Sequence, residues 1–173
     1  MESLKKYATK ALESVFGDAI VVKTSEVYTA PWVRFKCQFG CDFYGKSLTC
    51  PPHTPTPDQM RLILDSYTHA IFLHRNWHEG RRDVTEFHAA LLDLEFTLFF
   101  DGYYKALSLG TGPCKRCEKC NISGPCVHGD KARPSMEACG IDVFQTAKRL
   151  GLSLRVLQNR EDERHSCGLV LVE

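Results

Sequence analysis

The sequence predicts an α/β fold, in which a partly parallel sheet is flanked by helices and carries two cysteine-rich metal-binding loops. Segments with helical periodicity alternate with short β-branched or apolar segments, which is the order typical of such a fold. The chain has 173 residues, 43% of them hydrophobic, which is ordinary for one globular domain with its own core. Seven of the nine cysteines fall in two short blocks. We therefore expect residues 1–173 to form a single metal-binding domain, with cysteine-rich loops at 37–57 and 110–139.

The first part of the chain predicts helices at both ends and strands between them. Apolar residues of segment 3–16 recur every three or four positions, which is typical of an amphipathic helix. Residues 19–23 are β-branched, and residues 33–36 alternate between apolar and basic side chains, so we expect a strand at each place. The next expected helix begins at a cap formed by Thr56 or Asp58 and runs through Tyr67.

The second part of the chain continues the alternation. Residues 69–74 form a short apolar run, as in a buried strand, and residues 81–104 form the longest segment with helical periodicity. The remaining expected elements are a strand at 105–109, a helix at 141–150 and strands at 152–157 and 168–172. The strands at 33–36 and 105–109 each lead into a cysteine block. If they run parallel, the two blocks emerge at the same edge of the sheet and lie close together.

The second cysteine block is the most informative segment of the chain. Its four thiols have the spacing C-x2-C-x2-C-x5-C and are Cys114, Cys117, Cys120 and Cys126. Two successive C-x2-C steps are how bacterial ferredoxins supply the first three thiolates of a cubane cluster. Structural zinc sites more often use two separated C-x2-C pairs. The spacing therefore favours one 4Fe–4S cluster as the cofactor, with zinc as the alternative.

The first cysteine block supplies only three local thiols, Cys37, Cys41 and Cys50. A second metal site is expected here, because a proline follows Cys50 directly, as it does after ligands in ferredoxin-type sites. Three thiolates leave one iron position open, which is the arrangement that an enzyme needs to bind substrate at the metal. The site is instead closed if a distant residue is the fourth ligand, and the candidates are Cys139, Cys167 and His53. A zinc site with three cysteines and one histidine is a further alternative.

Charge and hydropathy exclude several classes of protein. The net charge is +1, with 22 basic and 21 acidic residues, so nothing indicates a nucleic-acid partner. No run approaches the roughly 18 apolar residues of a membrane span, and segment 1–16 lacks the apolar core of a signal peptide. We therefore expect a cytoplasmic protein without a membrane partner, in which cysteines are reduced ligands rather than disulfides. Histidines such as His74 do not cluster with the cysteines in sequence and are interpreted as structural.

Several short motifs accompany the cysteines and together resemble a known family. They are Cys37, Cys41, Tyr44-Gly45-Lys46, Cys50-Pro51-Pro52, Gly112-Pro113-Cys114, Cys117, Cys120, Cys126, residues 132–138 and residues 140–143. The chain resembles the cysteine-rich "predicted metal-binding protein" family, which is common in anaerobic bacteria and archaea. The resemblance covers most of the chain and implies metal, of the iron–sulfur kind, at these cysteines. It implies no established reaction.

Three functions remain open at this point. The leading hypothesis is electron transfer or another redox role with a partner protein, because a cluster with four thiolates has no vacancy for substrate. The alternative is an enzyme of lyase or desulfidase type, with an open-site cluster on Cys37, Cys41 and Cys50. The third is a zinc-stabilised binding module. No catalytic residue is assigned by the sequence.

Overall fold

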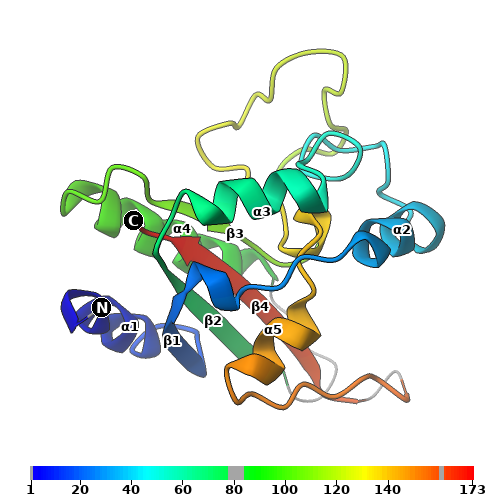
Figure 1. Ribbon diagram of the computed structural model, residues 1–173. Helices are drawn as coiled ribbons and strands as arrows, with labels where there is room; N and C mark the ends of the chain where they lie inside the picture. The colour runs from blue at the N-terminus through cyan, green and yellow to red at the C-terminus, as the bar shows by residue number, and fades with distance from the viewer. Residues whose placement is uncertain (1, 78–83, 160–161) are drawn as a thin grey trace.

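A four-stranded antiparallel sheet forms the centre of the protein in the computed structural model, which describes residues 2–77, 84–159 and 162–173. Its strands are β1 (Asp18–Lys23), β2 (His69–Trp77), β3 (Leu107–Leu109) and β4 (Arg164–Leu171). They lie in the order β1-β2-β4-β3 (Figure 1). All three strand pairs are antiparallel.

The expected partly parallel sheet is therefore wrong. That expectation followed from the alternation of predicted helices and strands and included a strand at 33–36, but these residues lie in helix α2 (Pro31–Gly40). Pro31 occupies the first turn of α2, where its fixed φ suits a helix and its missing N–H costs nothing. Residues 152–157, the other expected strand, have no regular secondary structure. An alternating or apolar run of four to six residues is too short to distinguish a strand from a helix or a loop.

The helices with clear periodicity are confirmed. They are α1 (Glu2–Leu12), α3 (Pro57–Asp65), α4 (Val84–Phe100) and α5 (Val143–Arg149). Thr56 caps α3, because its hydroxyl accepts the Gln59 N–H while the Gln59 side chain accepts the Thr56 N–H. The expected start of α4 at Arg81 lies outside the described residues. In the part of the chain that the structure describes, no helix has the length and apolar character needed to cross a bilayer.

Two hydrophobic cores lie on opposite faces of the sheet. Successive residues of a strand point to opposite faces, so in β2 Phe72 belongs to one core and Leu73 to the other. Helices α1 and α4 cover the face with Leu73, while α3, α5 and residues 136–143 cover the face with Phe72 (Figure 1). The chain thus forms a helix–sheet–helix sandwich, and the segments that carry the two cysteine blocks lie on one side of it (Figure 1).

Gly140 forms a junction between several of these segments. It follows the 3₁₀ turn η2 (Glu137–Cys139) with φ of +77°, and its carbonyl accepts the N–H of Ala30 just before α2. A Cβ on Gly140 would lie 2.6 Å from Cγ and 3.0 Å from Cα of Pro57, at the start of α3. Only glycine combines this backbone conformation with so close an approach.

We expect Gly140→Ala to lower the free energy of unfolding by about 2–4 kcal/mol, because a left-handed residue with a Cβ is strained and the methyl group overpacks Pro57. Gly151 is the matched control: its φ is +80°, but a Cβ there would meet nothing within 4 Å. Gly151→Ala should therefore cost only about 1 kcal/mol. Urea unfolding of both variants measures the difference, and equal losses would show that the contact with Pro57 is unimportant.

Candidate metal centre

The second cysteine block lies on a loop whose two ends are joined at the sheet. After β3, the Gly110 N–H donates to the Pro134 carbonyl (2.8 Å), and the Met136 N–H donates to the Gly110 carbonyl (3.1 Å). A parallel bridge between Gly110 and Ser135 completes this base. Residues 111–134, which we call the cysteine loop, project from the sandwich at the top of Figure 1. The loop therefore starts and ends at one fixed point.

A buried ion pair anchors the cysteine loop to α4. Arg133 donates from Nη2 to Glu95 Oε1 (2.5 Å) and from Nε to Glu95 Oε2 (2.9 Å), and the two side chains are only 10% and 5% exposed. Glu95 Oε2 also accepts the N–H of Ser108 in β3 (2.8 Å). A bidentate, charge-assisted pair of this kind fixes orientation as well as position. One carboxylate thus joins α4, β3 and the end of the cysteine loop.

His88 holds the other end of the cysteine loop. Its Nε2 donates to the Thr111 carbonyl (2.8 Å), and its ring lies where a Cβ of Gly110 would be. His88 and Glu95 are seven residues apart on α4, so they share one face of the helix, two turns apart. The structural interpretation of His88 agrees with this contact.

The four thiols of the second block share one pocket. Cys114, Cys117, Cys120 and Cys126 line it together with Leu48, Arg116, His128 and their neighbours. Partial desolvation and the negative charges of Cys120, Cys114 and Cys126 raise the pKa of the Cys117 thiol, and a cation bound beside it would lower that pKa. The pocket measures about 20 Å³.

The first cysteine block starts on α2 and not on a strand. Cys37 lies in the last turns of the helix, and Cys41 follows its final residue, Gly40. The chain then turns back, since the Gly45 N–H donates to the Pro51 carbonyl (2.8 Å). Cys50 is buried, and its pKa is raised to about 11 by burial and by the negative charge of Cys41. The three thiols of this block therefore influence one another electrostatically.

The two blocks lie side by side. The Leu48 N–H donates to Cys120 Sγ at 3.4 Å, and Leu48 is two residues before Cys50. Two residues of chain span at most about 7 Å, so Cys50 and Cys120 are neighbours. The blocks were expected to meet through parallel strands. They meet instead because the turn after α2 packs against the cysteine loop.

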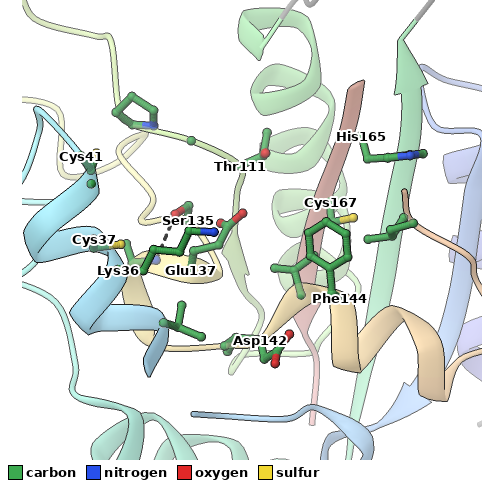
Figure 2. Close-up of a pocket in the computed structure, with 18 of the residues that line it drawn as sticks. Lys36, Cys37, Cys41, Thr111, Ser135, Glu137, Asp142, Phe144, His165 and Cys167 are labelled. Atoms are coloured by element: carbon green, nitrogen blue, oxygen red, sulfur yellow. Dashed lines mark hydrogen bonds between the residues drawn. The ribbon is translucent and has the colours of Figure 1, made fainter. Parts of the chain in front are cut away.

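A pocket of about 610 Å³ opens beside the first block. Cys37, Cys41 and Cys50 line it. In Figure 2, Cys37 and Cys41 lie on one side of the pocket, while Cys167 of β4 and Phe144 of α5 lie on the other. Its volume is within the range of small-molecule sites, about 300–1,000 Å³. Further lining residues are Trp32, Lys36, Tyr44, Glu137, Asp142, Arg155 and Arg164. The pocket gives a small molecule room beside the three thiols.

The candidates for a fourth ligand at the first block lie in different places. Cys139 is 1% exposed within the core that contains Met60 and Leu64, and burial raises its pKa to about 12. Cys167 faces the large pocket from β4, across from Cys37 and Cys41 (Figure 2). His53 is exposed. Cys167 thus lines the large pocket, whereas His53 lies next to the first block, since its backbone N–H donates to the Cys50 carbonyl (3.0 Å).

The thiols lie near one another, but they do not point at one common metal position. Within residues 2–77, 84–159 and 162–173, no group of three or more histidine, cysteine or carboxylate side chains stands in a geometry that holds a single metal ion. The thiols of the second block instead surround a shared pocket. The donor set, four cysteine sulfurs on one loop, is one that both a cubane cluster and a structural zinc ion take.

Comparison with known families also indicates metal binding. Residues 20–172 match the family described as "Predicted metal-binding protein (DUF2284)". The chain belongs to this family. The match confirms the resemblance drawn from the cysteine motifs, and the description of the family supports metal binding without naming a metal. No curated protein and no solved structure matches the chain.

Sequence reasoning missed the residues that position the centre. Glu95 lies between Leu91 and Leu98 on the apolar stripe of α4, and a charge in such a place is the signal that could have found it. Arg133 lies in the motif at residues 132–138, and its partner is Glu95. Leu48 acts through its backbone N–H, which no side-chain pattern reveals.

We expect Glu95→Gln to lower the free energy of unfolding by about 3–5 kcal/mol, because it leaves the Arg133 guanidinium buried without a counter-charge. Asp93→Asn, at an exposed position of the same helix, is the control and should change stability little. Denaturant unfolding measures the loss. Faster protease cleavage between residues 111 and 134 should accompany it, and unchanged cleavage would mean that Glu95 does not anchor the loop.

Proposed function

We propose that the protein is an iron–sulfur protein that holds one 4Fe–4S cluster on Cys114, Cys117, Cys120 and Cys126, with electron transfer as its role. The observation that carries the proposal is the shared pocket of the four thiols on a loop fixed at both ends. A cluster with four thiolate ligands accepts and releases single electrons without binding a substrate. Zinc at the same thiols is the alternative, and it would make the chain a binding module.

The surroundings of the second block suit a redox centre. The Leu48 N–H points at Cys120 Sγ, and hydrogen bonds to ligating sulfurs raise the reduction potential of a cluster. Lys115, Arg116 and Lys119 lie between the thiols in sequence and offset the negative charge of four thiolates. The cysteine loop projects from the sandwich, which gives a partner protein access (Figure 1).

A second metal site on Cys37, Cys41 and Cys50 belongs to the same proposal. Its nearness to Cys120 would let electrons pass between two centres held by one domain of residues 1–173. The partner is a redox protein and neither nucleic acid nor membrane. We place this activity in the cytoplasm of an anaerobic organism, where reduced thiols and iron–sulfur clusters persist.

The large pocket favours a second candidate function, an enzyme of lyase or desulfidase type. Cys37, Cys41 and Cys50 line a pocket that fits a small molecule, and Cys167, which also lines it, lies across the pocket from Cys37 and Cys41. A cluster held by three thiolates would supply an open iron that binds and polarises a substrate group. Tyr44 and Lys36 line the same pocket and would contact such a substrate.

The first test is the replacement of one thiol of the second block. We expect Cys117→Ser, purified without oxygen, to lose the iron and sulfide of one 4Fe–4S cluster while its circular dichroism is unchanged, because the two cores are formed by the sheet, the helices and residues 136–143. Ser123→Ala, which changes an exposed side chain of the same loop, is the control and should keep all its iron. Zinc without sulfide in the parent protein would contradict the proposal and support the binding module.

The second test separates the electron carrier from the enzyme. If the first block holds a cluster with an open iron, cyanide should change the spectrum of that cluster, whereas the cluster on the second block should not respond. The cleanest material is Cys117→Ser, which isolates the first block. Cys139→Ala and Cys167→Ala should leave the response intact. A loss of iron in either variant would show a closed site and remove the enzyme hypothesis.

A further inference from the structure

A small pocket lies between α4 and the base of the cysteine loop. Its volume is about 190 Å³. His88 lines it from α4, and the ring of His88 is held there by its hydrogen bond to the Thr111 carbonyl. Four basic residues of the cysteine loop also line it, namely Lys115, Arg116, Lys131 and Arg133. The proposed function does not involve this pocket.

The charge of the small pocket is of one sign. Lys115 and Arg116 come from the part of the cysteine loop that leaves the sheet, while Lys131 and Arg133 come from the part that returns to it. Among the described residues that line the pocket there is no aspartate or glutamate. Arg133 is neutralised by its ion pair with Glu95, so three cations remain. A cavity lined by charges of one sign concentrates ions of the opposite sign, which here are anions.

Lys131 has one acidic neighbour, and the contact between them is weak. Lys131 Nζ lies 3.9 Å from Asp130 Oδ2, and the two side chains are 57% and 66% exposed. Ion pairs between exposed side chains contribute about 1 kcal/mol at most, because water screens them. A bound anion can therefore replace Asp130 as the partner of Lys131 at little cost.

A side-chain hydrogen bond holds the two parts of the cysteine loop together at this pocket. Arg116 Nε donates to the Lys131 carbonyl (2.9 Å), which brings the cations of both parts to one place. Arg133 fixes the returning part, since its Nη1 donates to the Ala132 carbonyl (2.9 Å). Within the described part of the chain, Arg116 makes its hydrogen bond through Nε, which leaves Nη1 and Nη2 as donors for a ligand.

We propose that this pocket, which we call the oxyanion pocket, binds a phosphate group through Lys115, Arg116 and Lys131. A guanidinium group presents parallel N–H donors that match two oxygens of a phosphate, and the ammonium groups add positive charge. Sites for drug-sized ligands measure about 300–1,000 Å³, so the smaller oxyanion pocket suits inorganic phosphate or the phosphate end of an ester. The inference goes beyond the proposed function and does not depend on which metal the protein holds.

The oxyanion pocket adjoins the thiol pocket of the second block. Cys114 and Arg116 line both of them. Phosphate in the oxyanion pocket therefore lies next to the candidate metal centre. Arg116 is one of the cations that offset the charge of the thiolates, and bound phosphate offsets Arg116 in turn. Phosphate binding thus changes the electrostatic environment of the four thiols.

Titration with inorganic phosphate, followed by calorimetry at low ionic strength, tests the oxyanion pocket without any assay of activity. One phosphate should bind per chain, and the affinity should fall as sodium chloride is added, because salt screens the charges. We expect Lys115→Gln and Lys131→Gln each to weaken binding by about fivefold, since each removes one cation from the pocket. Both side chains are exposed, so the variants should fold normally.

Lys119→Gln is the matched control. It removes the same charge from an exposed position of the same loop, but Lys119 does not line the oxyanion pocket. The affinity for phosphate should change by less than about twofold. An equal loss in all three variants would show a general positive field without a site, and the proposal would then be wrong. Absence of binding at millimolar phosphate would overturn it as well.

A phosphate monoester such as glucose 1-phosphate separates the two sources of the ligand. Tighter binding of the ester than of inorganic phosphate would show that the pocket takes the end of a larger molecule, and weaker binding would show that it takes free phosphate. Either result requires the same loss in Lys131→Gln. Iron is measured separately, so protein that lacks iron but binds phosphate would refute only the iron–sulfur proposal.

Discussion

The buried ion pair between Glu95 and Arg133 is the contact on which the candidate metal centre depends. A charged pair inside a protein contributes little net stability, because desolvation offsets most of the attraction. The pair instead fixes positions. Glu95 accepts hydrogen bonds from Arg133 and from Ser108, so it holds α4, β3 and the cysteine loop in one arrangement. A loop without regular secondary structure needs such a fixed point if it is to present four thiols together.

The two cysteine blocks lie in different parts of the protein, one on a projecting loop and the other beside a pocket. The second block is on the cysteine loop, while the first block lies where α2 turns back toward the sandwich. The Leu48 N–H touches Cys120, so a structural change at one block reaches the other through a single turn of chain. The protein thereby places one candidate centre near its surface and the other beside a pocket of about 610 Å³.

Local patterns predicted the helices and the cysteine blocks, but not how the segments pair. Apolar spacing identified α1, α3, α4 and α5, because each buries one face against the sheet. The direction of strands is set by distant partners, and β4 pairs with both β2 and β3 although long segments separate them. The alternation at 33–36 was overridden by Pro31, which starts α2. The hydrogen bond between the rings of His74 and His165 joins residues 91 positions apart, and no sequence spacing reveals it.

The strand order has a consequence for how the protein is made. β4 is the last of the four strands along the chain, yet it lies between β2 and β3 in the sheet. Until β4 is synthesised, β2 lacks a neighbour on one edge and the three-residue β3 has nothing to pair with. Unpaired edges of this kind bind other chains. The nascent protein therefore passes through a stage in which its cysteine blocks are already synthesised while its sheet still lacks the strand that joins β2 to β3.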